Sequence, residues 1–291
     1  MVGYQLAQSP PCNGSIASVR AMKSSHDVVM RTGRLKVPSG TLFWHEAGRG
    51  ETLVFLHGSW HDSGQWLPVM QALATKYHGL VPDLIGFGES ISTATVHSVD
   101  LEVEALHTLL QALRIARCVL VGHSLGAWVA LRYAQRYPDQ VRGVAVVEPE
   151  GLVGAKGARW RLDRWLVNPL SPLVPVMTLA SWFGGKGKLR ALQRRRRTLR
   201  QAPAACQILF RRRPADIAAE QIDPNTLPIQ TVVQFLANPA SLSEESSRSS
   251  GMMLGLVQPV PAATTPLGLE ETATATALRQ LLATMLLTPA P

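Results

Sequence analysis

The chain has 291 residues, of which 46% are hydrophobic and 17% are charged, and its formal net charge is +9. This length and composition fit one large globular domain with an insertion or two small domains, and they exclude a wholly disordered chain. The three cysteines, Cys12, Cys118 and Cys206, are odd in number and far apart. That pattern argues against a disulfide framework and a C-x-x-C metal site. Nothing else in the sequence calls for a metal or an organic cofactor, and we expect neither.

The N-terminal residues 1–33 are polar and irregular, and we expect them to form a flexible leader. They show no basic flank followed by an apolar core, as a secretory signal would. Together with the cysteine usage, this favours a cytoplasmic location.

Residues 34–150 alternate between apolar strand-like runs and segments with helical spacing. The expected strands are 52–57, 79–84, 118–123 and 141–147. The expected helices are 65–77, 98–114 with Ser98 as N-cap, and 130–137. This alternation predicts an α/β fold, a mostly parallel sheet with helices on both faces. Active sites of such folds lie at the carboxyl ends of the strands.

Residues 151–225 are predicted to form a basic helical lid inserted into this core. Between 151 and 213 there are fifteen Lys and Arg residues and a single acid, Asp163. Three prolines in the uncharged run 166–183 argue against a membrane-spanning helix. We call residues 151–225 the lid segment.

Residues 226–291 form an atypical C-terminal segment, which we expect to be partly disordered. The stretch 227–236 is the next expected strand, but the last 56 residues contain no Phe, Tyr, Trp, Lys, His or Asp. Such a segment has few large apolar groups with which to complete a core.

The stretch VGHSLGAW, residues 121–128, has the spacing of a G-x-S-x-G nucleophile elbow between a strand and a helix. Gly122 and Gly126 leave room for the sharp turn, and Ser124 is exposed at a helix N-terminus. A second element, LHGSW at 56–60, follows a buried strand. Its Ser59 amide and the amide of Leu125 are placed to donate to an oxyanion. His57, Gly58, Trp60 and His123 are the residues expected to line this site.

LHGSW, PDLIGFGES and VGHSLGAW together resemble the α/β-hydrolase superfamily, in its lid-bearing esterase and lipase-like branch. The resemblance covers about 34–150 well and reaches into the lid segment. It implies that Ser124 is a nucleophile acylated by an ester, that Ser59 and Leu125 form the oxyanion hole, and that Asp83 braces its loop. Such enzymes carry an acid and then a histidine later in the chain.

The sequence departs from that order, because no histidine follows His123 and no aspartate follows Asp223. Glu148, directly after the strand that follows the elbow, is the candidate acid, with helix capping by Glu148 or Glu150 as the structural alternative. His61 and His97 are the candidate substitutes for the missing base.

Three explanations remain open: a non-catalytic descendant that binds without hydrolysing, an unusual base, or a reading-frame shift near residue 228. The abrupt change in composition favours the third, and translating the other two frames of the gene would test it. If the last strands are missing, the sheet ends in an uncovered edge and the chain is marginally stable.

We therefore predict a serine hydrolase acting on an ester or related acyl bond through a Ser124 acyl-enzyme. The alternative is a binding protein on the same scaffold. The expected partner is a small, hydrophobic ester or acyl substrate, and the oligomeric state is not determined. The arginines of the lid segment are read first as a solvated helix face and next as a contact with an anionic membrane. Nucleic acid is disfavoured.

Overall fold

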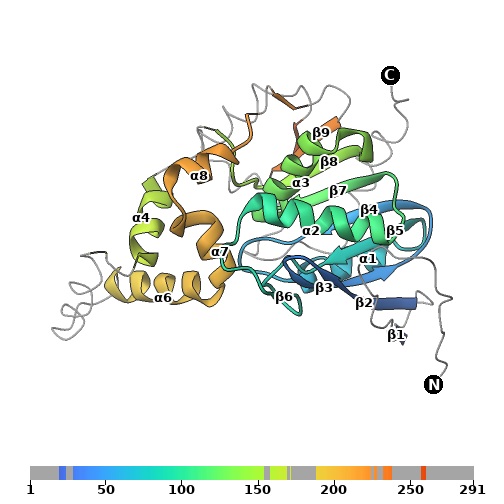
Figure 1. Ribbon diagram of the computed structural model, residues 1–291, viewed down its shortest axis with the longest axis horizontal. Coiled ribbons are helices and arrows are strands. Elements are labelled where there is room, and N and C mark those ends of the chain that lie inside the picture. Colours follow the sequence, from blue (N-terminus) through green and yellow to red (C-terminus); the bar gives the residue numbers. More distant parts are fainter. Residues whose placement is uncertain are drawn as a thin grey trace.

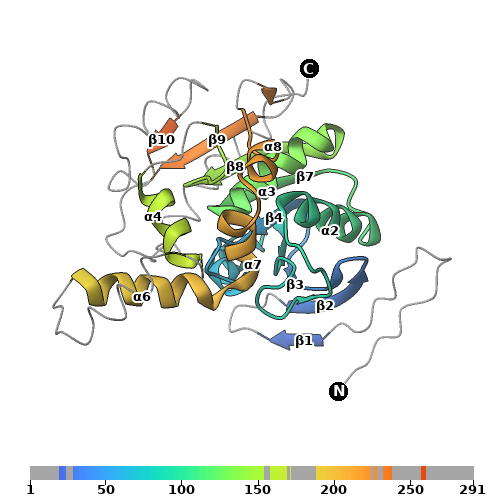
Figure 2. The same ribbon diagram turned by 60° about the vertical axis from the view of Figure 1, so that its left-hand side comes forward.

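The strands form one mixed sheet with helices on both faces, and further helices gather at one side of it (Figures 1 and 2). The computed structural model describes residues 20–23, 29–153, 158–168, 171, 188–223, 226–227, 232–237 and 257–259. The predicted α/β fold is confirmed. Within the described residues, no helix is both long enough and apolar enough to span a membrane.

The sheet runs in the order β1-β2-β3-β5-β4-β7-β8-β9-β10, with β6 paired to β3. The strands from β5 to β10 along this path pair in parallel, whereas β1, β2 and β3 are antiparallel to their neighbours. The strands are β1 (Arg20–Lys23), β2 (Val29–Val37), β3 (Gly40–Ala47), β4 (Glu51–Leu56), β5 (Tyr77–Pro82), β6 (Ile91–Ser92), β7 (Cys118–His123), β8 (Val141–Val147), β9 (Val232–Ala237) and β10 (Val257–Pro259).

The central strand β4 shows how the sequence divides the core into two layers. Leu53 and Phe55 pack with helix α1 (Leu67–Leu73), whereas Val54 and Leu56 pack with α2 (Val99–Ala112) and α3 (Leu125–Arg136). Successive side chains of a strand point to opposite faces, so a continuous apolar run buries both. The chain leaves β4 toward β5 and leaves β7 toward β8. The adjacent β4 and β7 therefore form a topological switch point, where sites are usually found.

Helix α2 begins where the sequence predicted. Ser98 is its N-cap and accepts a hydrogen bond from the amide of Leu101 at 3.0 Å. Two short 3₁₀ turns, η1 (Ser63–Gln65) and η2 (Pro138–Gln140), precede α1 and β8 respectively.

Three predicted boundaries are wrong, and one of them is the start of the helix expected at 130–137, which begins at Leu125. The core begins before residue 34, because Val29–Val37 is a strand that pairs along its length with β3. The rest of the expected leader, apart from β1, lies outside the described residues. The helix expected at 65–77 is confined to Leu67–Leu73, because the Asp62 side chain caps the preceding 3₁₀ turn and the chain is already extended at Tyr77.

The described part of the lid segment is largely helical. It contains α4 (Ala158–Val167), α6 (Lys188–Gln201), α7 (Pro203–Cys206), the π-helical turn η3 (Gln207–Arg211) and α8 (Pro214–Ala219). Both views show α4 and α6 to one side of the sheet (Figures 1 and 2). Most of the uncharged run 166–183 lies outside the described residues.

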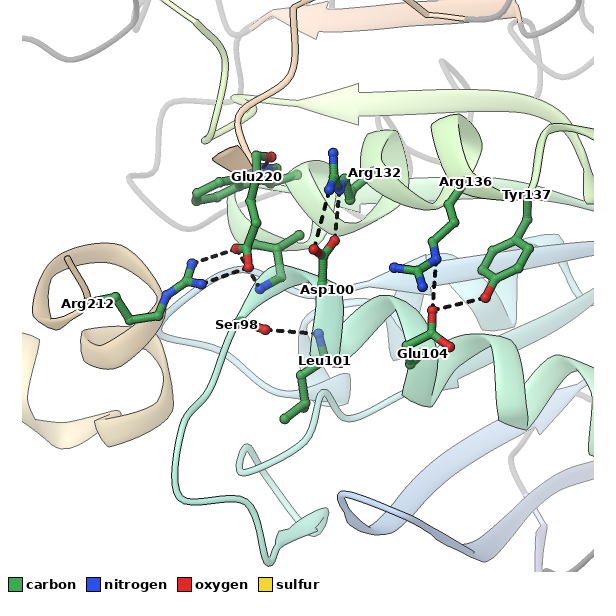
Figure 3. A network of polar contacts seen from close by, with 11 residues as sticks. Ser98, Asp100, Leu101, Glu104, Arg132, Arg136, Tyr137, Arg212 and Glu220 are labelled. Atoms are coloured by element: carbon green, nitrogen blue, oxygen red, sulfur yellow. Dashed lines mark hydrogen bonds and ion pairs between the residues drawn. The ribbon is translucent and has the colours of Figure 1, made fainter. Parts of the chain in front are cut away.

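Glu220, half of a buried ion pair within the lid segment, joins this segment to the core (Figure 3). Glu220 accepts two hydrogen bonds from the guanidinium of Arg212, and each side chain is 9% exposed. The same carboxylate accepts from the amide of Val99 at the start of α2, at 3.0 Å. The carbonyl of Glu220 also accepts from the indole of Trp128 on α3, at 2.8 Å. Since one residue contacts three elements, the lid segment has a fixed position beside the elbow helix.

The predicted strand at 227–236 corresponds to β9, which pairs in parallel with β8. We expected the sheet to end in an uncovered strand edge after this strand. That expectation is wrong for the last three residues of β9, because β10 pairs with Phe235, Leu236 and Ala237. Residues 238–256 and 260–291 of the C-terminal segment lie outside the described residues.

Candidate functional site

Ser124 occupies a strained backbone position between β7 and α3. Its φ of 52° and ψ of −111° lie outside the conformations that residues with a Cβ ordinarily adopt. Such strain costs about 1–3 kcal/mol and persists only where the surroundings enforce it. Here the Ser124 amide donates to the carbonyl of Val147 on β8 at 2.9 Å, and the Ser124 carbonyl accepts from the amide of Trp128 at 3.2 Å.

The two glycines of the elbow are required by close backbone contacts. A Cβ on Gly122 would lie 2.5 Å from the carbonyl oxygen of Gly126, and a Cβ on Gly126 would lie 2.3 Å from that of Leu56. Neither backbone group can move without breaking β4 or α3. The G-x-S-x-G spacing therefore brings the elbow directly against the end of β4.

Ser124 opens into a cavity of about 740 Å³ between the sheet and the lid segment. Its polar end carries hydroxyl, imidazole and carboxyl groups from Ser59, His61, His123, Ser124 and Glu150. Its apolar wall is formed by Trp128, Leu152, Leu199, Leu209, Phe210 and Ile217. Arg195 and Asp163, paired side chain to side chain, lie on the lid side of the same cavity.

The loop after β4 supplies part of this wall. The cavity is lined by Ser59, Trp60 and His61 of this loop. The preceding His57 and Gly58 were also expected to line it but do not. Leu125 is the first residue of α3, and an amide at that position has no partner within its helix.

His57 lies behind the cavity and fixes the loop. Its Nε2 accepts from the amide of Leu84 at 3.0 Å, so its Nδ1 carries the proton and donates to the carbonyl of Gly58 at 2.9 Å. Burial lowers the pKa of His57, which keeps the ring neutral. The expectation that His57 lines the site is corrected to a bracing role.

Asp83 and Glu102 brace the neighbouring loop after β5. Asp83 accepts from the amides of Ser63 at 2.6 Å and Glu89 at 2.7 Å, in agreement with the bracing role expected for it. Glu102, on α2, accepts from the amide of Ile85 at 2.9 Å, and its other oxygen has no hydrogen-bond partner. Burial raises the pKa of Glu102 to about 8, so this carboxyl is protonated at neutral pH.

The two histidines predicted as substitute bases, His61 and His97, differ in whether they line the cavity. His61 and His123 both line the cavity, with ring centroids 6.0 Å apart. Burial, and next the charge of His123, lower the pKa of His61. His97 does not line the cavity: it packs against Gly86, and its amide donates to the side chain of Gln207. The structure therefore does not bring His97 to Ser124.

The two glutamates after β8 have different surroundings. Glu148, at a φ of 47°, is partly exposed, and its Oε2 lies 3.8 Å from Nε2 of His123. Glu150 lines the cavity, where its carboxylate accepts a hydrogen bond from the Ser59 hydroxyl at 2.9 Å and where the Ser124 hydroxyl lowers its pKa. The sequence reasoning singled out Glu148 and missed the contact of Glu150 with the nucleophile candidate. The sequence E-P-E at 148–150 contains no feature that indicates which of the two glutamates contacts Ser124.

Comparison with protein families gives one match over most of the chain. A family model described as "Alpha/beta hydrolase family" matches residues 53–286. The matched range covers β4, the elbow, the lid segment and most of the C-terminal segment.

Among curated proteins, an uncharacterized protein of Mycobacterium tuberculosis is 34% identical over 147 residues, 48% of this chain and 43% of that protein. The pimeloyl-[acyl-carrier protein] methyl ester esterase of Vibrio atlanticus is 34% identical over 125 residues, 42% of this chain and 46% of the esterase. The 2-hydroxy-6-oxo-2,4-heptadienoate hydrolase of Pseudomonas putida is 33% identical over 142 residues, 46% of this chain and 48% of that enzyme. The chain thus spans about half the length of the curated relatives it matches.

Solved structures share the fold at lower identity. Haloalkane dehalogenase DbeA of Bradyrhizobium elkani superposes with a TM-score of 0.66 at 18% identity, covering 88% of this chain and 98% of that one. A thermophilic esterase of Thermogutta terrifontis superposes with a TM-score of 0.61 at 19% identity, covering 87% and 98%.

The protonated state of Glu102 predicts a pH-dependent stability. The folded carboxyl holds its proton up to about pH 8, whereas the unfolded one loses it near 4.5, so rising pH favours the unfolded chain across this window. Glu102→Gln keeps the acceptor for Ile85 and removes the titration. We expect it to stabilise the fold by about 4 kcal/mol at pH 8 and by less than about 1 kcal/mol at pH 5.

Chemical unfolding at the two pH values measures this difference. Glu104→Gln, two residues along the same helix at an exposed position paired with Arg136 and Tyr137, is the matched control. It should change stability by less than about 1 kcal/mol at both pH values. A Glu102→Gln effect that does not grow with pH would contradict the assignment.

Proposed function

The chain belongs to the α/β-hydrolase family, and on that premise we propose that it is a serine hydrolase that cleaves an ester or related acyl bond. Ser124 is the nucleophile in this proposal and becomes acylated. The amides of Ser59 and Leu125 form the oxyanion hole. Trp60, His61 and His123 complete the polar end of the substrate site.

The observation that carries the proposal is the strained backbone of Ser124. This residue is the N-cap of α3, and it lines the cavity. Strain of this kind is retained where a side chain must be held in one exposed position. The N-terminus of α3 adds the positive end of the helix dipole, which favours the negative charge that develops on the carbonyl oxygen.

The cavity supports a hydrophobic acyl group as the substrate class. Six apolar side chains form its wall beyond the polar end, so an acyl chain can lie there while the ester carbon faces Ser124. The names of the Vibrio atlanticus esterase and the Pseudomonas putida hydrolase agree with hydrolysis as the reaction class.

Labelling with an alkyl fluorophosphonate tests the nucleophile. We expect the wild-type chain to be labelled, faster by a long-chain than by a methyl phosphonate because of the apolar wall, and Ser124→Ala to lose the label. Ser92→Ala, which lies on β6 outside the cavity, is the control and should label as the wild type does. Labelling is read by mass spectrometry of the modified peptide.

The second candidate is a non-catalytic binding protein on the same scaffold. It is favoured by one observation, that no histidine follows His123 in the sequence. A wild-type chain that is folded but not labelled by the fluorophosphonate would support the binding protein and contradict the serine hydrolase.

The basic face of α6 supports an anionic membrane as a further partner. Arg194, Arg197 and Arg200 are exposed on this helix, and arginines meet lipid phosphates at such surfaces. We expect co-sedimentation with liposomes that contain anionic lipid, and a loss of it when the three arginines are replaced by glutamine. Equal binding to neutral liposomes would contradict an electrostatic contact. The proposal also places the protein in the cytoplasm, where it would meet the membrane surface.

A further inference from the structure

One carboxylate of the cavity described above, that of Glu150, belongs to a residue hydrogen-bonded directly to the elbow serine. The Ser59 hydroxyl donates to Oε2 of Glu150 at 2.9 Å, and the Ser124 hydroxyl is near enough to the same carboxyl to lower its pKa. The backbone joins the same two residues, since the amide of Glu150 donates to the carbonyl of Ser124 at 3.2 Å. Glu150 is thus fixed against the elbow by main chain and side chain together.

The neighbouring imidazoles are engaged differently. His123 precedes Ser124 and turns its Nε2 toward Glu148, at 3.8 Å, while its Nδ1 is buried against Gly58 without a hydrogen-bond partner. His61 packs edge to face against the His123 ring. Within the described residues of the cavity, the base that lies beside the Ser124 hydroxyl and interacts with it is a carboxylate.

We propose that Glu150 is the catalytic base of this chain and takes the place of the missing histidine, with the Ser59 hydroxyl holding its carboxylate in position. The inference rests on the proposed function, because it assigns the proton acceptor for the nucleophile Ser124. It concerns a residue that the usual order of nucleophile, acid and histidine does not contain.

The proton balance follows directly from this contact. As Ser124 Oγ forms its bond to the acyl carbon, its proton passes to the Glu150 carboxylate. When the tetrahedral intermediate collapses, the bond to the leaving alcohol breaks and the alkoxide takes that proton. Water then gives a proton to Glu150 as it attacks the acyl-enzyme, and Ser124 recovers a proton from Glu150 as the acid departs.

The surroundings of Glu150 make it a stronger base than an exposed carboxylate. Burial raises the pKa of Glu150, the hydrogen bonds from Ser59 and Ser124 and the charge of His123 lower it, and the charge of Asp163 raises it. Asp163 is itself paired with Arg195, and His61 and Glu148 are the other titratable groups at this end of the site. The net direction is upward, toward the operating pH, where a general base works best.

The test is the rate at which a fluorophosphonate labels Ser124 in the full chain, measured against pH. We expect Glu150→Gln to lower this rate at pH 7.5 by about 100-fold or more. In the wild type, the rate should fall with decreasing pH, with a midpoint above the ordinary carboxyl pKa of about 4.5, and Glu150→Gln should lose that dependence. Circular dichroism and thermal unfolding confirm that the variant is folded.

Two further variants keep the proposal falsifiable. Added formate should restore labelling in Glu150→Ala, where it can enter the space left by the side chain, and should not restore labelling in Ser124→Ala. Glu148→Gln tests the rival pair of His123 and Glu148, and should lower the rate less than Glu150→Gln does.

The outcomes separate this inference from the function on which it rests. A wild-type chain that labels at Ser124, with Glu150→Gln labelling at the same rate, keeps the hydrolase proposal and overturns Glu150 as the base. A larger loss in Glu148→Gln than in Glu150→Gln overturns it as well. A folded wild-type chain that does not label at all removes the proposed function and this inference together.

Discussion

The strained turn at Ser124 is the constraint on which the rest of the site depends. Hydrogen bonds maintain its backbone angles. The amide of Ser124 donates to β8, and its carbonyl accepts from the first turn of α3 and from the amide of Glu150. The same turn requires Gly122 and Gly126, since a side chain at either position would collide with the backbone of α3 or β4. One residue thus ties the two central strands, the elbow helix and the loop after β8 into a single arrangement.

Buried polar groups around the turn extend this arrangement outward. His57, Asp83 and Glu102 each accept a hydrogen bond from a loop amide at the carboxyl ends of β4 and β5. On the lid side, Glu220, which is paired with Arg212, connects the lid segment to α2 and α3. Buried polar groups must be paired to be tolerated, so these loops have few alternative positions.

The parts of the fold set by local pattern could be predicted from the sequence. The strands at Cys118–His123 and Val141–Val147 coincide with their predicted ranges, because each is a continuous apolar run between residues that end a strand. The cap at Ser98 was predicted for the same reason, since its hydrogen bond is local. The start of β2 was missed because Val29–Val37 is half-exposed and is held by pairing with β3, a contact the sequence pattern does not encode.

The sequence predicts only those parts of the candidate site whose reactive residues lie within a motif of recognisable spacing. The elbow and the loop at Ser59 carry recognisable spacing, so Ser124, Ser59 and Leu125 could be named. The choice between Glu148 and Glu150 depends on how the chain turns after β8, where a φ of 47° at Glu148 directs the next residues back over the elbow. Such a turn is a tertiary feature, and the sequence alone gave no reason to expect that Glu150 contacts Ser124.

A crystal structure of the phosphonylated chain tests the central claim most directly. The account predicts a phosphorus atom bonded to Ser124 Oγ, its oxygen within hydrogen-bond distance of the amides of Ser59 and Leu125, and the Glu150 carboxyl beside the same Oγ. An adduct on another residue, or a phosphoryl oxygen turned away from both amides with Glu150 withdrawn from Ser124, would contradict it.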